Sequence, residues 1–557
     1  MIISRSIVIC HLVAITCLWA VWEYRVSTGT KSPIDPPPMA GPDVIVGDIP
    51  NISRWGTDTD ETSFSIGTTS CNIGNAQLAW FSNTSAHPVI SQNMFRVKNG
   101  RIEQLGMAWL KHGFTALQQS VCGPCTASSS GSWLGVGCSD PYSSSLNGGQ
   151  SGLGPRSQIT ASTGDFPMPY GKLVTPYGTM DGRLRVFTAD INPALNANSR
   201  YFVESQYVAK DDATAGNDNN NASYREVSVT TVSGGWGLGF GTPSSTTVRE
   251  QPAINAWKAV HADVKLFAVD VPGDGRIIVG MRTTPLPGNT GYHTEFAVEN
   301  LNSHQSVRSL GVKYGSSTIS NPGFHDVDYQ FEPYSGTDWT PTIVGSDIVW
   351  STETFAANQN ANALRWSTLY SFWCDSELPP RKLTLGMFRT GAVSTMNIDL
   401  VQQVIPESFV IRKGMAIGGM FPEVFLSDDV DFKLGLAAKS SPPTIELELK
   451  STSATETPTD FAFRLEAAEV GAPFGNVIQS IKLFNYDTGL YEVVDMRAAE
   501  TTDLQLDVTP SGDLGRFVQN GTKSVQARIE WVGSQSPVGS RFGWSVDVDQ
   551  AIWLIGQ

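Results

Sequence analysis

The sequence predicts a mainly β protein, with two or three β-sandwich or jelly-roll-like domains behind an N-terminal export segment. Apolar and polar residues alternate with a period of two in many short segments, the pattern of half-buried antiparallel strands. Turn residues separate these segments at intervals of about 8–12 residues, a spacing typical of sandwiches and jelly rolls. The 53 glycines and 32 prolines are too many for a helical bundle, and they follow no collagen-like period.

Composition and charge narrow the class of protein further. The chain has 557 residues, of which 40% are hydrophobic and 16% are charged. This length predicts about three domains at roughly 100–200 residues each, and the apolar fraction is enough for sizeable cores. The 53 acidic residues outnumber the 38 basic ones, so the net charge is −15. Because a nucleic-acid groove needs the opposite sign, we expect no nucleic-acid partner.

Residues 1–30 predict a signal peptide or a signal anchor. Arg5 precedes an apolar stretch that runs from Ile7 to Trp22, which is the order of a charged n-region and an h-region. Residues 31–44 follow as a proline-rich spacer that cannot enter a core. We therefore expect a secreted or cell-surface protein whose membrane contact is made through the N-terminal segment alone.

The middle of the chain gives the clearest secondary-structure patterns. Residues 264–284 consist of two apolar runs around a Pro-Gly-Asp-Gly turn, which predicts a β-hairpin. Residues 292–300 and 364–375 alternate apolar and polar side chains, so each predicts one strand. Cys374 falls on the apolar face of the second strand, which predicts a buried thiol. Residues 101–119 favour a helix, since several of their apolar residues fall loosely on one side.

The domain boundaries are placed from length and composition. We expect a cysteine-containing β-rich domain at 45–256, a β-sandwich at 257–404 and a C-terminal β-sandwich at 405–557. The C-terminal domain is the best supported, because seven alternating segments with turn spacing follow a Ser- and Pro-rich stretch at 440–443.

Four cysteines allow three interpretations. Cys71, Cys122, Cys125 and Cys138 can form two disulfides that staple a loop-rich region, and an oxidising compartment favours this. The Cys-Gly-Pro-Cys spacing of the second and third also matches a redox motif, although a glycine- and serine-rich loop follows it instead of a helix. With His112, the last three cysteines could instead hold zinc. The sequence does not choose among the three possible disulfide connectivities.

Carboxylates in residues 323–332 are the first candidates for chemistry. In an extended chain Asp326 and Asp328 project to the same side, where they could share a proton as an acid–base pair or hold calcium, with Glu332 nearby. A solvated strand face would have the same composition. His112 is a further catalytic candidate, as a base, although its aromatic surroundings favour a structural histidine.

A second set of oxygen ligands lies in the loop at 211–221. Asp211, Asp212 and Asp218 are candidate calcium ligands, although their order does not fit an EF-hand; a plain surface loop is the alternative. His293 and Glu295 share one strand face, which favours an exposed polar surface over a catalytic pair. No Walker A, G-x-S-x-G, H-E-x-x-H or dinucleotide-binding motif is present.

Several stretches resemble an uncharacterised family of secreted bacterial proteins of the planctomycete type. The resemblance is carried by DVIVGDIPNISRWG (43–56), IGTTSCNIGNAQLAWFSNTSAHPVI (66–90), WLKHGF (109–114), GVGCSDPYSSSLNG (135–148) and GFHDVDYQFEPYSGTDW (323–339). The stretch IKLFNYDTGLYEVVDMRAA (481–499) is similar to a β-sandwich module appended to such proteins. The resemblance implies export and β-rich extracellular domains. It implies no activity and no catalytic residues, because the family has none assigned.

Two functions of different classes remain open. The first is a non-catalytic extracellular or cell-surface protein with a binding or structural role, whose partners are extracellular glycans or cell-envelope components. The second is a secreted hydrolase or lyase that acts on an extracellular polymer such as a polysaccharide, since its carboxylates need no short motif. A concave pocket with two carboxylates favours the enzyme, and a flat surface favours binding.

Overall fold

The computed structural model describes residues 27–28, 40–175, 177–241, 245–314, 317–437, 441–471, 477–533 and 544–556. The predicted export segment, residues 1–30, lies outside this part except for β1 (Ser27–Thr28), which pairs with β17 (Lys265–Asp270). In the described part the prediction of a mainly β chain is confirmed, and every strand pairing there is antiparallel. No helix within it is long and apolar enough to span a membrane.

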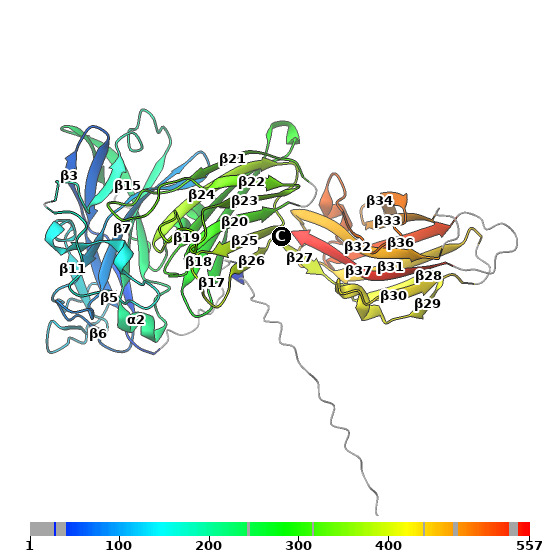
Figure 1. Cartoon of the computed structure of the whole chain (residues 1–557), viewed down its shortest axis with the longest axis horizontal. Coiled ribbons are helices and arrows are strands. Elements are labelled where there is room, and N and C mark those ends of the chain that lie inside the picture. The colour runs from blue at the N-terminus through cyan, green and yellow to red at the C-terminus, as the bar shows by residue number, and fades with distance from the viewer. Residues whose placement is uncertain are drawn as a thin grey trace, which may run out of the picture.

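The first region, at one end of the molecule, is built of several small sheets around a larger one (Figure 1). The larger sheet has the order β12 (Leu153–Gly154), β9 (Leu110–His112), β7 (Val89–Lys98), β14 (Arg200–Val208), β15 (Ala222–Val232) and β16 (Gly235–Gly239), and β8 (Arg101–Met107) also pairs with β7. The smaller sheets are β11 (Ser139–Tyr142), β5 (Thr68–Asn72) and β2 (Val44–Asp48); β13 (Leu184–Phe187), β4 (Glu61–Ile66) and β3 (Ile52–Thr57); and β10 (Trp133–Leu134) with β6 (Leu78–Ala79). Short helices α1 (Ser144–Asn147) and α2 (Lys210–Ala215) lie in its loops.

The second region is a two-sheet sandwich. One sheet has the order β1, β17, β18 (Arg276–Pro285), β19 (Tyr292–Asn300), β24 (Thr368–Ser376) and β21 (Ile319–His325). The other has the order β22 (Thr340–Val344), β23 (Asp347–Ser351), β20 (Val307–Lys313), β25 (Lys382–Met387) and β26 (Thr395–Asp399). Their inner faces meet in one core that contains Phe296, Phe372 and Trp350.

The third region is a second two-sheet sandwich at the opposite end of the molecule (Figure 1). One sheet has the order β29 (Met415–Gly418), β30 (Phe432–Gly435), β37 (Ser545–Gly556), β32 (Asp460–Val470) and β35 (Gln505–Val508), and β27 (Val401–Val404) pairs with β37. The other has the order β28 (Ser408–Lys413), β31 (Thr444–Thr452), β36 (Ser524–Gly533), β33 (Val477–Asn485) and β34 (Leu490–Ala498). The pairing of β27 places residues 401–404 with this sandwich.

The first two regions share a hydrophobic cluster. Helix α3 (Ile254–Val260) connects them, and its Trp257 is fully buried in a cluster that contains Phe95 of the first region and Ile278 of the second. The Trp257 indole donates a hydrogen bond to the carbonyl of Gly100 at 2.8 Å. Burying apolar surface from both sides contributes roughly 25 cal/mol per Å², so this contact fixes the two regions against each other.

The strand predictions in the middle of the chain are confirmed, and the helix prediction is wrong. Residues 264–284 form the β17–β18 hairpin, and residues 292–300 are β19. Of the strand predicted at 364–375, residues 368–375 belong to β24, which contains Cys374 as a buried free thiol, while residues 364–367, which include a turn, precede the strand. The region 101–119 contains β8 and β9 up to residue 112, followed by irregular structure, instead of a helix. The helical pattern was weak, and pairing of both segments with β7 decided the conformation.

Candidate functional site

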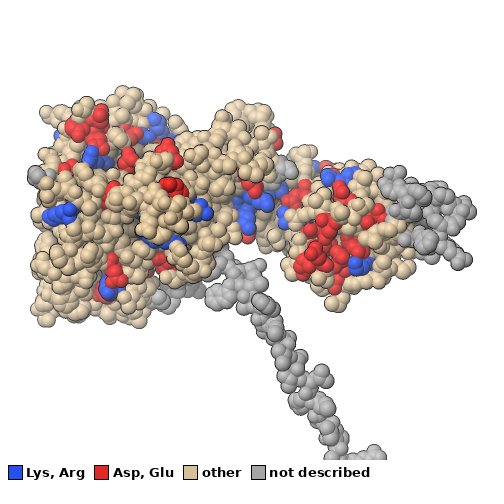
Figure 2. All heavy atoms as spheres, viewed as in Figure 1, with Lys and Arg blue, Asp and Glu red and all other residues tan. Residues whose placement is uncertain are grey.

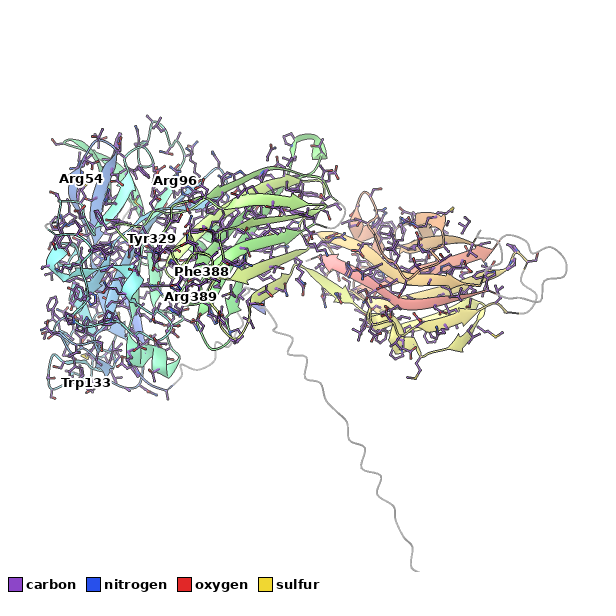
Figure 3. The ribbon with its side chains drawn as sticks, in the orientation of Figure 1. Arg54, Arg96, Trp133, Tyr329, Phe388 and Arg389 are labelled. Carbon is purple, nitrogen blue, oxygen red and sulfur yellow. A yellow bond between two sulfur atoms is a disulfide. The ribbon has the colours of Figure 1, made fainter. Side chains whose placement is uncertain are left out.

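A groove with a volume of about 450 Å³ opens where the first region meets the second. Residues of β8 and β13 form one side, and the segment 325–331, which includes the end of β21, forms the other. Tyr329 of this segment lies at the junction of the two regions (Figure 3).

The side made by β8 and β13 depends on one close backbone approach. A Cβ on Gly106 of β8 would collide with the carbonyl of Arg185 in β13, so the strands can lie this close because the residue is glycine. The Arg185 side chain forms an ion pair with Glu61 of β4, which also lines the groove. At the end of β13, Phe187 is 46% exposed.

The opposite side, segment 325–331, is anchored by two of its residues, Val327 and Gln330. Val327 is buried in the core of the second region. Gln330 is buried and reaches across to the first region, where its Nε2 donates to the carbonyls of Met107 and Arg183, each at 2.7 Å. The extended strand that the sequence predicts through residues 326–332 is not observed, since β21 ends at His325. This leaves the residues between the anchors free to face the groove.

Phe331 ends this segment in an unusual backbone conformation. Its φ is +61°, a left-handed value that costs a bulky non-glycine residue of order 1–3 kcal/mol. The side chain is 46% exposed, and its ring meets the edge of the Trp109 ring at 6.2 Å between centroids. The groove therefore carries two exposed phenylalanines, at positions 187 and 331.

The two predicted carboxylates, Asp326 and Asp328, both line this groove. Asp326 is half-buried and accepts a hydrogen bond from the side-chain amide of Asn362. Burial raises the pKa of Asp326; the Asn362 hydrogen bond opposes this, and the charges of Asp328 and Asp338 raise the pKa further. Asp328 is exposed. The two carboxyl groups thus share a surface but lie in unlike environments.

Further polar groups in the groove were not identified from the sequence. Asp190 lines the groove, and its carboxylate accepts a hydrogen bond from Arg96 at 3.0 Å. Gln104 is buried, with its Oε1 bonded to the backbone N–H of Leu369 at 2.7 Å. Its Nε2 has no hydrogen-bond partner among the described residues, so a buried amide donor in the groove lining is unsatisfied.

The third carboxylate of the sequence prediction, Glu332, does not join the other two. It is buried, and its Oε1 accepts from the backbone N–H groups of Arg156 and Ser157 at 2.6 and 3.2 Å. Burial raises the pKa of Glu332 to about 7, and the nearby Arg156 charge opposes the rise. Its role in this structure is to hold the first and second regions together.

The calcium candidates of the 211–221 loop are placed apart, each with its own protein partner. Asp211 accepts a hydrogen bond from the N–H of Ala79 at 2.7 Å, and Asp212 accepts one from the N–H of Val44 at 2.9 Å. Asp218 accepts one from the side-chain amide of Asn302 at 2.8 Å. Asp212 is fully buried, which raises the pKa of its carboxyl well above the usual range. These contacts organise the loop around α2.

The four cysteines form two disulfides, Cys71–Cys122 and Cys125–Cys138. The disulfide interpretation is confirmed, and the connectivity that the sequence left open is settled. The two cysteines of the Cys-Gly-Pro-Cys motif bond to different partners, so they do not form a redox pair with each other. Disulfides persist in oxidising compartments, which fits an extracellular protein.

His112 lies away from the groove, in a buried pair with His87. The Nε2 of His87 and the Nδ1 of His112 are 3.0 Å apart, and the His112 ring stacks on Tyr170 at 3.7 Å. Burial lowers the pKa of His112 to about 3, with smaller contributions from the charges of His87 and Lys111. This histidine is therefore neutral at physiological pH.

His293 and Glu295 belong to a half-buried ion-pair chain on β19. The His293 ring bonds to Glu295 at 2.9 Å and to Asp375 at 2.6 Å, and Arg101 of β8 pairs with Glu295 at 2.6 Å. Hydrogen bonding to Glu295 raises the pKa of His293, and burial partly opposes the rise. This chain adds a polar contact between the first and second regions.

Acidic side chains gather on the visible face of the third region (Figure 2). Asp429, Asp503 and Asp549 have carboxylate oxygens within 4.8 Å of one another, the one such group of His, Cys, Asp or Glu within metal-binding reach in the described residues. Burial raises the pKa of Asp503 to about 6, and the neighbouring carboxylates raise it as well. Hard cations such as Ca²⁺ prefer oxygen ligands of this kind, although two of the three residues are exposed and both oxygens of Asp549 accept from the N–H of Asp428.

No protein-family model and no curated protein matches the chain. Among solved structures, the CBM22-1–CBM22-2 tandem domain of Xyn10C from Paenibacillus barcinonensis is 10% identical, with a TM-score of 0.19, over 52% of this chain and 91% of that one. SGBP-B from a xyloglucan utilization locus of Bacteroides uniformis is 10% identical, with a TM-score of 0.18, over 60% of this chain and 95% of that one. A chain of infectious bursal disease virus, Gt strain, is 10% identical, with a TM-score of 0.15, over 53% and 70%.

Proposed function

We propose that this is a secreted or cell-surface protein that binds an extracellular glycan or cell-envelope polysaccharide in the groove between its first two regions. The observation that carries the proposal is the pair of exposed phenylalanines, Phe187 and Phe331, in a groove lined with carboxylates. Aromatic faces offer a large apolar contact for the C–H faces of a sugar ring, and the carboxylates accept hydrogen bonds from its hydroxyl groups.

Two details of the groove support a ligand in place of a plain surface. Phe331 keeps its exposed ring at the cost of a left-handed backbone, and strained residues of this kind cluster at functional sites. The unsatisfied Nε2 of Gln104 supplies a donor for an oxygen acceptor. Export through residues 1–30 and membership of the secreted family named above belong to the same proposal; a reporter active only outside the cytoplasm, fused behind residues 1–44, tests the export.

Alanine substitution in the groove tests the binding. Phe331→Ala and Phe187→Ala remove the apolar surface, so we expect each to weaken binding to a polysaccharide panel by about tenfold or more, as for aromatic anchors elsewhere. Phe409→Ala is the matched control, since this phenylalanine of the third region is 37% exposed and lies outside the groove. Affinity gel electrophoresis measures all three. Equal retention of wild type and both groove variants on every glycan that the wild type binds would contradict the proposal.

A hydrolase acting on the same polymer is the second candidate. The criterion stated for the sequence favours it, since the groove is concave and holds two carboxylates, Asp326 and Asp328, in unlike environments. A glycosidase acid needs a raised pKa, which burial gives Asp326, and the second carboxylate, Asp328, is exposed beside it. Asp326→Asn distinguishes the two functions. For an enzyme, release of reducing ends falls by orders of magnitude while binding persists; for a binding protein, wild type and variant release none.

A further inference from the structure

A second and smaller cavity, the arginine pocket, shares Tyr329 with the groove. It has a volume of about 20 Å³, which is room for one water-sized atom. Three arginines line it: Arg156 of the first region, on the turn after β12, and Arg365 and Arg389 of the second, before β24 and after β25. Figure 3 shows Tyr329 and Arg389 close to this junction.

The hydrogen bonds of Arg365 are incomplete. Its Nη2 donates to the carbonyls of Gln359 and Ala361 at 3.2 and 3.0 Å, and its guanidinium stacks on the Tyr334 ring at 3.6 Å. Its Nε and Nη1 are buried and have no hydrogen-bond partner within the described residues, although the residue is just 4% exposed. The buried hydroxyl of Tyr329 also lacks a partner there. Three donor groups beside one small cavity are therefore unsatisfied.

The arginines of the pocket also lack directly bonded carboxylates. Neither Arg156, Arg365 nor Arg389 forms a salt bridge with any carboxylate in the described part of the chain. Glu332 and Glu204 act on Arg156 through their charges, and Asp274 acts on Arg389 in the same way. All three carboxylates accept hydrogen bonds from backbone N–H groups instead of from these guanidinium groups. The buried guanidinium of Arg365 therefore has no directly bonded counter-ion. Burying an unpaired charge costs several kcal/mol in proteins, so such charges are found paired.

We propose that the arginine pocket binds one monatomic anion of the halide class, with chloride as the abundant example. A single such ion fits the volume, accepts from the N–H and O–H donors together, and supplies the directly bonded counter-ion that Arg365 lacks. Phosphate or sulfate needs more room than the pocket offers. A water molecule fits, but it brings no charge. Because the arginines come from two regions, the ion ties the first region to the second directly behind the groove.

Thermal unfolding in different sodium salts at constant ionic strength tests the proposal on the full chain. Replacing gluconate by chloride or bromide at 300 mM should raise the Tm of the first two regions by about 2–5 °C, through binding to the folded state alone. Arg365→Gln and Tyr329→Phe should each reduce this halide-specific rise, the former by removing the charge and the latter by removing one donor. Arg200→Gln is the matched control, since this arginine is exposed and paired with Glu226.

Crystals grown in bromide give a readout that does not depend on the stability of any variant. We expect an anomalous peak within hydrogen-bond distance of Arg365 in the wild type, and about tenfold or more loss of bromide affinity in Arg365→Gln. A Tm that is the same in gluconate and in halide, or a pocket without an anomalous peak in bromide, overturns the proposal. An ordered water in place of the peak has the same consequence.

Discussion

Glu204 and Glu299 form a buried carboxyl pair at the start of α3, with their side chains bonded to each other. Glu204 also accepts from the N–H of Ala253 at 2.6 Å, and Glu299 from the N–H of Ile254 at 3.0 Å. Burial raises the pKa of both groups, and the charge of Glu204 raises the pKa of Glu299 further. Ionisation of both groups is disfavoured, because burial and the like charge of the partner both oppose the second negative charge, and the pair therefore tends to share a proton.

This shared proton makes the stability of the protein depend on pH. The pKa of the pair in the folded protein lies above the ordinary carboxyl value of the unfolded chain. The shared proton therefore contributes its full stabilisation below the pKa of the unfolded chain, and this contribution is lost as the pH rises through the pKa of the folded protein. In Glu299→Gln the amide replaces the protonated carboxyl. We expect the variant to match the wild type at pH 5 and to exceed its free energy of unfolding by roughly 1–3 kcal/mol at pH 8.

Urea unfolding of the wild type and the variant at both pH values measures this difference. Glu299→Leu is the comparison, because it leaves the N–H of Ile254 without an acceptor and should destabilise by about 1–3 kcal/mol at either pH. A Glu299→Gln variant that loses stability at pH 8 would mean that both carboxylates are ionised in the folded protein.

At the same scale, sequence reasoning reached one side of the groove and missed the other. Asp326 and Asp328 could be identified because carboxylates two residues apart are visible in a sequence. Phe187 and Glu61 could not be identified in this way. Their strands, β13 and β4, pair with each other, and neither pairs with the segment around residue 328. The left-handed φ of Phe331 has no sequence signature either, since the residue is not glycine, asparagine or aspartate.

Among the secondary-structure elements, strands with a regular alternation were predictable and irregular segments were not. The β17–β18 hairpin follows from its turn, in which Gly273 takes a φ of +70°. The segment after β21 alternates just as regularly, yet it leaves the sheet because Gln330 bonds to the first region. A tertiary contact of this kind overrides local pattern, and it cannot be seen before the fold is known.

The two disulfides staple loops of different length, which leads to a prediction about their contributions. Cys71–Cys122 closes 51 residues and Cys125–Cys138 closes 13. From the loop-entropy relation, we expect Cys71→Ser with Cys122→Ser to cost about 4 kcal/mol of unfolding free energy, and Cys125→Ser with Cys138→Ser about 3 kcal/mol. Denaturant unfolding of the two double variants measures the order. The reverse order would show that local packing, and not loop length, decides these contributions.

On the scale of the whole molecule, composition predicted separate β-sandwich regions but not how they are joined. The first and second regions share a core through Trp257. The second and third regions meet beside the C-terminal end of β37 (Figure 1). The contact there is polar. Arg381, which precedes β25, is buried and donates to Asp460 of β32 at 3.0 Å and to Asp507 of β35 at 3.2 Å.

Removing Arg381 should therefore loosen the third region from the second without unfolding either. Arg381→Met leaves Asp460 buried beside Asp507 without its cation, and breaking a buried pair in this way costs about 3–5 kcal/mol. Burial already raises the pKa of Asp460, and Arg381 opposes that rise, so loss of the arginine should raise this pKa further. We expect the variant to show a larger maximum dimension in small-angle scattering at pH 8 than at pH 5, where protonation of Asp460 relieves the penalty.

Arg497→Met is the control, because Arg497 pairs with Asp495 on the exposed surface of the same sandwich and should change the free energy of unfolding by about 1 kcal/mol or less. Scattering curves of Arg381→Met that match the wild type at both pH values would show that the linkage between the two sandwiches, and not this ion pair, sets their arrangement.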